Sequence, residues 1–240
     1  MKNKEKKNHI VSFSGGKDST AMLLMMLQKN MPIDEIIFCD TGMEFPQMYD
    51  HIYEIEYYIN RPIKILKPEY TFEYYMKEYM PTKGKRKGIS GLGWMTMSQR
   101  WCTYFLKERV MNKYLADNRK NCIEYHGIAF DEPKRINKNK HINVKYPLFE
   151  WKITEKQALE FCYNHGFNWG GLYEHFDRVS CWCCPFSNLK ELRALRTNYP
   201  KLWNKLKDME TKSHNTFRYK VSVFDLDRRF TEEDKQILLH

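Results

Sequence analysis

Two glycines followed by a lysine, an aspartate and a serine form the segment of this sequence best suited to holding a polyphosphate. The segment SGGKDS lies between a short apolar run and a run with helical spacing. Glycine lets the backbone approach phosphate oxygens closely, and the N–H groups of a helix N-terminus attract anions. Lys17 can neutralise phosphate charge, and Asp18 could hold a magnesium ion directly or through water. A plain strand-to-helix turn is the alternative. The predicted binding residues are Ser14, Gly15, Gly16, Lys17, Asp18 and Ser19.

Cysteine is the second residue type whose spacing indicates chemistry. The chain has seven cysteines, and three of them crowd into the segment Cys181-Trp182-Cys183-Cys184. An odd number and this crowding favour metal or sulfur chemistry in a reducing compartment over a disulfide framework. Cys181 and Cys184 have the C-x-x-C spacing that can hold one metal ion or one edge of a cluster. Spacing alone does not separate zinc from iron–sulfur ligation, so both remain open.

The elements that must position these groups alternate between strand and helix. Apolar runs at residues 9–13, 36–39 and 62–66 predict strands, and helices are expected at 18–29 and 46–59. This order implies right-handed crossovers and a doubly wound parallel sheet of the α/β class. The glycine segment then lies at the carboxyl end of the first strand, where ligands of such sheets bind.

The rest of the chain predicts more helix than strand. Residues 81–97 contain four glycines among basic residues and predict a mobile loop. A helix is expected at 99–115, a strand at 122–127 and a short extended segment at 146–148. Thr154 and Gln157 predict a capping box, and leucines on both sides of Pro200 predict two further helices. We expect a nucleotide-binding domain at 1–150 and a cysteine-containing helical cap at 151–240, packed on the same domain.

Composition places the chain among globular proteins. Its 240 residues are 42% hydrophobic and 29% charged, with 40 Lys and Arg against 30 Asp and Glu. The resulting charge of +10 favours polyanionic partners. The longest apolar run, at residues 21–27, is too short to cross a bilayer, so no membrane partner is expected. The basic N-terminus MKNKEKKNHI lacks a signal-peptide core, and we therefore expect a cytoplasmic protein.

The sequence resembles a known superfamily at three segments. SGGKDST resembles the PP-loop of the ATP pyrophosphatases, which split ATP between its α and β phosphates and adenylate a substrate. The segments 38–42 and 127–135 are similar to further signatures of the PAPS reductase and ATP sulfurylase branch. The resemblance spans about residues 9–190 and implies ATP and Mg²⁺ as cofactors. It places the turn Asp40-Thr41-Gly42 near adenosine and Arg135 at phosphate, with Lys17, Asp18 and Arg135 as catalytic residues. A plain turn and a surface arginine are the alternatives for the last two segments.

A distant cysteine extends the resemblance. The arrangement of Cys102 with Cys181 and Cys184 resembles that of assimilatory adenylylsulfate reductases, in which a Cys-Cys pair and a distant C-x-x-C hold a [4Fe-4S] cluster. In this chain Thr103 stands in place of the second cysteine of the pair. Cys102, Cys181 and Cys184 would leave one iron open, as in PP-loop tRNA 2-thiocytidine synthases. Alternatively Cys183 supplies a fourth thiolate and closes the site. Cysteine-ligated zinc is the further alternative. The remaining cysteines, Cys39, Cys122 and Cys162, are expected in the core.

The expected function follows from an intact PP-loop combined with cluster-type cysteines. By resemblance, the chain would adenylate a substrate with release of pyrophosphate and transfer sulfur to it. DNA-phosphorothioation proteins combine the same two features. A sulfonucleotide reductase that does not cleave ATP is one alternative, although no thiol follows Cys184. A nucleic-acid-binding zinc protein is another. The expected partners are an adenine nucleotide, sulfide or a sulfur-donor protein, a second copy of the chain, and a nucleic acid acceptor. The acceptor is suggested by Lys83, Lys85, Arg86, Lys87, Trp94 and Trp101.

Overall fold

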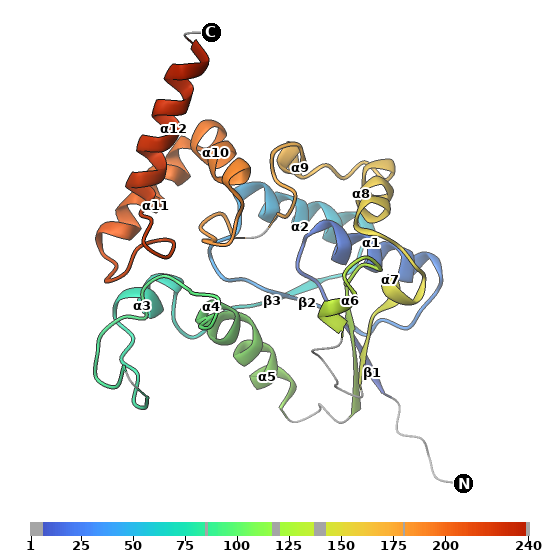
Figure 1. Cartoon of the computed structure of the whole chain (residues 1–240). Coiled ribbons are helices and arrows are strands. Elements are labelled where there is room, and N and C mark those ends of the chain that lie inside the picture. The colour runs from blue at the N-terminus through green and yellow to red at the C-terminus, as the bar shows by residue number, and fades with distance from the viewer. Residues whose placement is uncertain (1–6, 85, 117–120, 137–142, 180, 239–240) are drawn as a thin grey trace.

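Five parallel strands form one sheet in the computed structural model, which describes residues 7–84, 86–116, 121–136, 143–179 and 181–238. The strand order is β3-β2-β1-β4-β5 (Figure 1). All four neighbouring pairs are parallel, which confirms the predicted sheet type. Residues 1–6, which include most of the basic N-terminus, lie outside the described residues. The strands are β1 (Asn8–Ser12), β2 (Glu35–Cys39), β3 (Ile63–Leu66), β4 (Cys122–His126) and β5 (Val144–Lys145).

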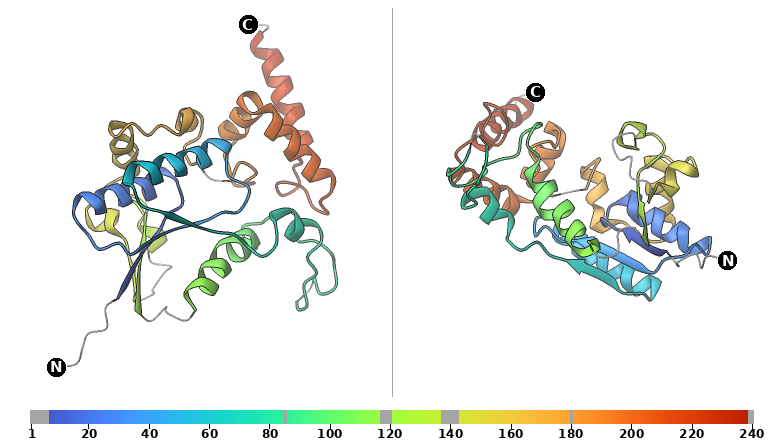
Figure 2. Two further views of the ribbon diagram at one scale, coloured as in Figure 1. Left: turned by 180° about the vertical axis from the view of Figure 1, so that it is seen from behind. Right: turned by 90° about the horizontal axis from the view of Figure 1, so that it is seen from below.

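Helices cover both faces of the sheet (Figures 1 and 2). Strand side chains alternate between the faces, so Val11 joins a large core with α1 and α2, whereas Ile10 packs with Leu115 of α5. The fold is therefore a doubly wound α/β fold, as predicted. The helices are α1 (Lys17–Gln28), α2 (Pro46–Ile59), α3 (Phe72–Lys77), α4 (Trp101–Thr103), the π-helical turn η1 (Tyr104–Glu108), α5 (Arg109–Leu115), α6 (Pro133–Ile136), α7 (Pro147–Glu150), α8 (Glu155–Asn164), the 3-10 turn η3 (Trp169–Gly171), α9 (Leu172–His175), α10 (Leu189–Asn198), α11 (Pro200–Thr211) and α12 (Val223–Leu238).

The C-terminal region is helical, as predicted. The capping box of Thr154 and Gln157 is present at the start of α8, and Pro200 begins α11 at a position where its missing N–H costs nothing. Helix α8 lies against α1, and η3 lies against α2. The boundary at residue 150 stays a prediction. No helix of the described residues is both long and apolar enough to span a membrane.

One predicted segment differs from the structure. The extended segment at 146–148 is wrong, because the strand is the preceding β5 and Pro147 begins helix α7. The loop at 81–97 is anchored through Trp94 on the segment before α12, and its mobility stays a prediction. Asn215 accepts the Trp94 N–H at 2.7 Å and donates to the Trp94 carbonyl at 3.0 Å, while the Trp94 ring meets Phe217 edge to face. Lys85 lies outside the described residues.

Gly127 sets how closely β4 approaches the start of α1. A Cβ atom at this position would lie 2.8 Å from both the Cα and the N of Ser19. Backbone atoms cannot yield as a flexible side chain can, so the strand end and the glycine turn approach each other only with glycine here.

We predict that Gly127→Ala lowers the free energy of unfolding by about 2 to 3 kcal/mol, because the added methyl overpacks against backbone. Gly166→Ala is the matched control: Gly166 has φ +87° and nothing within 4 Å of the added atom, so it carries only backbone strain. That strain costs about 1 kcal/mol. Urea unfolding of both variants provides the measurement, and equal losses would show that the close approach is not a constraint.

Candidate functional site

The glycine turn between β1 and α1 forms where it was predicted and is fixed by its own hydrogen bonds. Gly15 has φ +76°, and a Cβ there would lie 2.5 Å from Met48 Sδ. Trp169 Nε1 donates to the Gly15 carbonyl at 2.7 Å. The Ser14 and Ser19 hydroxyls are 3.0 Å apart, and Ser19 Oγ donates to the Gly16 carbonyl at 3.0 Å. Both hydroxyls therefore sit inside one turn, from which α1 begins at Lys17.

Lys17 is held by carboxylates. Its side chain is 7% exposed, and Nζ lies 3.0 Å from Asp18 Oδ2 and 2.6 Å from Glu155 Oε1. Burial opposes the charged form, but the two carboxylates outweigh it and raise the pKa of Lys17. The Lys17 N–H donates to the Tyr173 hydroxyl at 2.8 Å. Two of the three N–H donors of Lys17 Nζ thus already meet carboxylates, and a bound phosphate would compete with them for this ammonium; the sequence did not predict the contact with Glu155.

Three carboxylates gather next to this lysine. Asp18, Glu132 and Glu155 place one oxygen each within 4.8 Å of one another. Burial raises the pKa of Asp18 to about 6; Lys17 opposes this shift, and Glu155 and Glu132 add to it. Asp18 Oδ1 is buried without a hydrogen-bond partner in the described part of the chain. Arg135 Nη1 lies 2.5 Å from Glu132 Oε2, so the predicted Arg135 joins the same group. Carboxylate oxygens are the ligands that Mg²⁺ prefers, so this donor set fits that ion.

The turn after β2, Asp40-Thr41-Gly42, is fixed by its own hydrogen bonds and lies beside the cysteines. Asp40 Oδ1 accepts the Gly42 N–H at 2.8 Å and the Tyr49 hydroxyl at 2.7 Å, which fixes the turn. Thr41 Oγ1 donates to the Glu44 carboxylate and lies 3.6 Å from Cys181 Sγ. Thr41 therefore lies beside the cysteines. Whether the turn also contacts adenosine stays a prediction.

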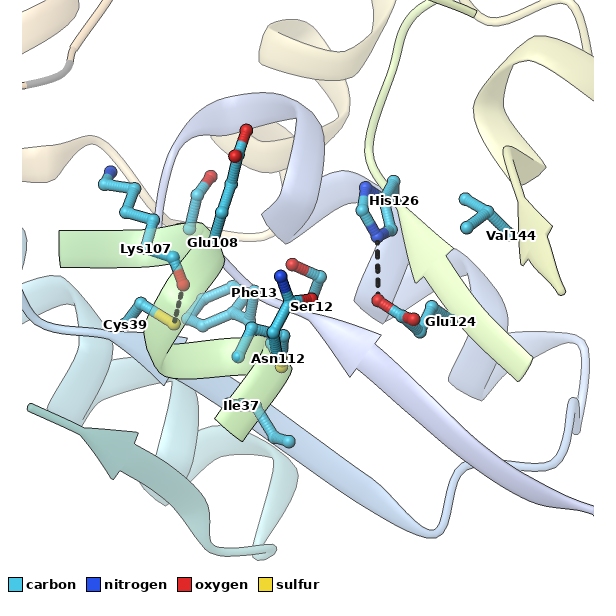
Figure 3. Close-up of a pocket in the computed structure, with 12 residues that line it drawn as sticks. Ser12, Phe13, Ile37, Cys39, Lys107, Glu108, Asn112, Glu124, His126 and Val144 are labelled. Carbon is cyan, nitrogen blue, oxygen red and sulfur yellow. Dashed lines mark hydrogen bonds and ion pairs between the residues drawn. The ribbon is translucent and has the colours of Figure 1, made fainter. Parts of the chain in front are cut away.

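A cavity of about 410 Å³ lies at the carboxyl ends of β1, β2 and β4, on the side of the sheet that faces α5. Ser14 of the glycine turn is part of its wall. Figure 3 shows Ser12, Lys107 and His126 around the same cavity. Glu124 and His126 also line it, with His126 Nε2 3.5 Å from Glu124 Oε2. Cys39 lines it too, so its assignment to the core is wrong, although burial raises the pKa of its thiol to about 11. Periodicity within β4 could have placed Glu124 and His126 on one face.

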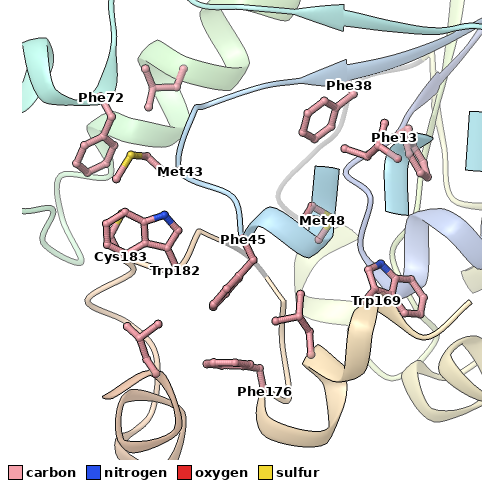
Figure 4. Close-up of a cluster of buried hydrophobic side chains, with 14 of the residues drawn as sticks. Phe13, Phe38, Met43, Phe45, Met48, Phe72, Trp169, Phe176, Trp182 and Cys183 are labelled. Atoms are coloured by element: carbon pink, nitrogen blue, oxygen red, sulfur yellow. The ribbon is translucent and has the colours of Figure 1, made fainter. Parts of the chain in front are cut away.

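Three of the four predicted cysteine ligands surround a second cavity, of about 200 Å³. Cys102 comes from α4, whereas Cys181 and Cys184 come from the segment after α9. Trp182 N–H donates to the Met43 carbonyl at 3.1 Å, which fixes this segment beside the turn after β2. Cys183 is fully buried and does not line the cavity. Figure 4 shows it in the hydrophobic core near Trp182.

The thiols of this cavity are neutral as they stand. Burial raises the pKa of Cys181 to about 12, with the nearby Glu44 carboxylate adding to the shift. Burial also raises the pKa of Cys102 and of Cys184. A bound metal would have to displace these protons, and Lys107 and Arg100 on the cavity wall would favour the thiolates.

The spacing of the sulfurs bears on the metal. Tetrahedral zinc, with bonds of about 2.3 Å to sulfur, brings its thiolates to about 3.8 Å of one another. Among the described residues, only Asp18, Glu132 and Glu155 form a set of three potential ligands within 4.8 Å, so the cysteine sulfurs are more widely spread. A [4Fe-4S] cluster binds each cysteine at a different iron, so its ligands stand further apart. The cysteine cavity thus fits such a cluster better than zinc.

Lys107 connects the two cavities and was missed by sequence reasoning. It lies on η1, the π-helical turn between Cys102 and α5, and lines both cavities. Its Nζ lies 3.8 Å from Glu44 Oε1. The only signal for it in the sequence is its spacing from Cys102. A π-helical turn inside a helix often marks a functional site.

Several known proteins are similar in sequence to parts of this chain. An uncharacterized protein of Methanocaldococcus jannaschii is 27% identical over 220 residues, which cover 84% of this chain and 41% of that protein. A second protein of this organism is 28% identical over 218 residues, covering 85% and 48%. A nin region protein of Escherichia phage lambda is 30% identical over 145 residues, covering 53% and 50%. The chain thus spans about half, or less, of the length of these relatives.

Two solved structures are similar at low sequence identity. The phosphoadenylyl-sulfate reductase of Candida auris aligns with a TM-score of 0.48 and 14% identity, covering 72% of this chain and 81% of that one. The U34-tRNA thiolase NcsA of Methanococcus maripaludis, solved with its [4Fe-4S] cluster, aligns with a TM-score of 0.45 and 16% identity, covering 99% and 74%.

One protein family accounts for most of the chain. The sequence profile of the phosphoadenosine phosphosulfate reductase domain matches residues 8–187, from the start of β1 to just beyond Cys184. This range includes the glycine turn, the first cavity, the predicted cysteine ligands and every lining residue of the second cavity except Glu191, and it confirms the resemblance found in the sequence. The chain therefore belongs to the phosphoadenosine phosphosulfate reductase domain family.

Proposed function

We propose that this chain is an ATP-dependent sulfur-transfer enzyme that adenylates its substrate with release of pyrophosphate. One observation carries the proposal: the cavity that begins at the PP-loop and the cavity lined by three cysteines share the wall residue Lys107. A substrate activated in the first cavity would therefore lie next to a sulfur-holding centre in the second.

ATP would bind with its phosphates on the glycine turn and its nucleoside in the 410 Å³ cavity. Backbone N–H groups at the start of α1 favour negative charge there. Lys17 would exchange Glu155 for a phosphate oxygen, and Arg135 would reach the phosphates from the Glu132 side. Asp18, Glu132 and Glu155 would hold a magnesium ion, which would neutralise phosphate charge.

The reaction proceeds in two displacements. An oxygen of the substrate attacks the α-phosphorus, the bond to the β-phosphate oxygen breaks and pyrophosphate leaves. A sulfur nucleophile then attacks the activated carbon, and AMP leaves with the former substrate oxygen. Lys107, between the two cavities, is positioned to balance the negative charge of the adenylate.

Cys102, Cys181 and Cys184 would hold the cluster, and Cys183 would not. When bound, a [4Fe-4S] cluster on three thiolates would supply one iron with an open position for hydrosulfide. Trp182 and the core around Cys183 exclude water from one side of the site. The cavity wall also contributes Arg100 and Arg178, whose positive charge favours an anionic sulfur species.

The family match supports a second candidate, a sulfonucleotide reductase that binds its substrate in the same cavity without cleaving ATP. Pyrophosphate release separates the two functions, because only the sulfur-transfer enzyme breaks the bond between the α and β phosphates.

We expect the anaerobically reconstituted protein to release pyrophosphate and AMP from ATP in the presence of sulfide and cell nucleic acid. Lys17→Met should slow this release by at least about tenfold, since a charge-assisted hydrogen bond to phosphate contributes roughly 1.5 to 3 kcal/mol. Lys201→Ala, on the exposed side of α11, is the control. An iron-loaded protein that reduces an adenylyl sulfate but releases no pyrophosphate from ATP would support the reductase instead.

Iron content tests the ligand set. After anaerobic reconstitution, Cys102→Ala, Cys181→Ala and Cys184→Ala should each lose most of their iron and sulfide, because each removes one of three thiolates. Cys183→Ala should keep both, as should Cys162→Ala, a control at an equally buried cysteine outside the cavity. If Cys183→Ala lost as much iron as the others, the site would be closed by four cysteines. Zinc without iron in every variant would exclude the cluster.

The pH dependence tests the magnesium site. A divalent cation binds the carboxylate and not the carboxylic acid, and the pKa of Asp18 is raised to about 6. The gain in ATP affinity on adding Mg²⁺ should therefore shrink as the pH falls from 7 to 5, more steeply than for a carboxyl with an ordinary pKa. In Asp18→Asn the gain should be small at both values. Calorimetric titration with and without Mg²⁺ measures it, and the same pH profile in both proteins would exclude Asp18 as a ligand.

A further inference from the structure

A third cavity lies on the flank of the helix that runs from Trp101 to Leu115, and it shares no lining residue with the two cavities described above. It measures about 530 Å³ and lies between the end of β3 and the helix, and Lys67, Arg109 and Lys113 bring three positive charges to its wall. Glu69 is the one acidic residue among its described lining residues. We call this feature the β3 groove; Tyr70 stands beside it, with its ring centroid 6.1 Å from that of the lining residue Tyr75.

The cations of the β3 groove are available for an anion. Arg109 and Lys113 are both exposed and lie one turn apart on α5. Neither side chain makes an ion pair or a hydrogen bond with another described residue, and Lys67, which is 74% exposed, lies 3.9 Å from Asp40. The protein has a net charge of +10, and Lys67, Arg109 and Lys113 lie along one groove. Polyanions are therefore attracted to this groove.

Aromatic rings line the same groove. Tyr75 of α3 stacks on Phe105 of η1 with centroids 4.5 Å apart, so α3 and the helix adjoin here (Figures 1 and 2). Tyr70 stacks on Tyr74 at 4.3 Å and remains 43% exposed. The outer face of the Tyr70 ring therefore continues an existing stack, and a planar base could extend it.

From this combination we propose that the β3 groove binds single-stranded nucleic acid. Backbone phosphates would lie on Lys67, Arg109 and Lys113, and an unpaired base would stack on Tyr70. Rings and cations in one groove are the means by which proteins hold single strands with little sequence preference. The bases of a double helix are stacked on one another, so they cannot reach a ring at the side of a groove.

The β3 groove and the cysteine cavity lie along one helix. Phe105 of the groove is three residues from Cys102, so the two residues are neighbours on successive turns. A strand bound in the groove would thus lead toward the cysteines. Binding in the groove stands without the proposed function, whereas its use as the acceptor of sulfur rests on it.

Fluorescence anisotropy with a labelled 20-nucleotide single strand, at several salt concentrations, tests this inference. The variant Arg109→Gln/Lys113→Gln should bind at least tenfold more weakly at low salt. Its dependence of log affinity on log salt should be flatter by about 1.4, since each phosphate contact to a single strand contributes about 0.7. The control, Lys201→Gln/Lys212→Gln, removes the same charge from exposed sites of α11 and its end and should change neither quantity appreciably.

The proposed stacking of a base on Tyr70 is tested by separate variants. Tyr70→Ala should lower the affinity by roughly 5-fold to 160-fold without altering the salt dependence, since a stacked base contributes about 1 to 3 kcal/mol. Tyr70→Phe should restore the affinity. Circular dichroism confirms that each variant is folded.

Three results would overturn the inference: no measurable binding by the wild type, the same salt dependence in the α5 variant and its control, or equal affinity for a duplex of the same length. Pyrophosphate release and iron content, measured on the same preparations, separate this failure from a failure of the proposed function. If the protein cleaves ATP and holds iron but does not bind the single strand, only the proposal for the β3 groove is refuted. If it binds the single strand but neither cleaves ATP nor holds iron, only the proposed sulfur transfer is refuted.

Discussion

The helix that runs from Trp101 to Leu115 is the constraint on which the whole site depends. It must cover one face of the sheet with Leu115 while reaching past the strand ends with Cys102. Leu106 is fully buried, and Trp101 Nε1 donates to the Gly93 carbonyl at 3.0 Å, so the helix cannot rotate freely about its axis. Lys107 lies in a π-helical turn, in which each backbone hydrogen bond spans one residue more than in an α-helix. Within two turns this helix contributes to three cavities: Cys102 and Lys107 line the cysteine cavity, Lys107 also lines the cavity at the strand ends, and Arg109 lines the β3 groove.

Acidic side chains gather on one side of the glycine turn, and basic side chains gather on the other side, next to this helix. On the α8 side, Asp18, Glu132 and Glu155 surround Lys17 and favour a cation. On the α5 side, Lys107 and the arginines of the cysteine cavity favour anions. A polyphosphate at the turn would lie between the two groups, with its metal on one side and its reacting end on the other. The buried Glu44 links the second group to Cys181, because it lies near both Lys107 and that thiol.

The sequence predicts local structure well because local structure depends on nearby residues. The bounds of α2, from Pro46 to Ile59, agree with the prediction, since proline suits the first turn and the apolar spacing defines the buried face. The capping box at Thr154 and the glycine turn at Ser14 are also determined by a few adjacent residues. The parallel, doubly wound class of the sheet also follows from the alternation of strands and helices, whereas the order β3-β2-β1-β4-β5 is known only from the structure.

Contacts between distant residues could not be predicted. Lys17 and Glu155 are 138 residues apart, and no periodicity connects them. The burial of Cys183, between two cysteines that line a cavity, depends on the core formed by Trp182 and Phe72, which come from different parts of the chain. Cys39 has the apolar neighbours of a core residue, yet it stands at a strand end that opens into a cavity. The resemblance to a family supplied the pairing of Cys102 with Cys181 and Cys184, which spacing alone does not.

A cluster on three cysteines and a nucleotide on the PP-loop would share the wall residue Lys107. Electron paramagnetic resonance of the reduced, reconstituted protein, recorded with and without a non-hydrolysable ATP analogue, measures whether the two sites adjoin. We expect an iron–sulfur signal whose g values shift when the analogue binds, and no such shift in Lys107→Met, which still binds the analogue. A protein without the signal, or a signal that saturating analogue leaves unchanged, would refute the shared wall.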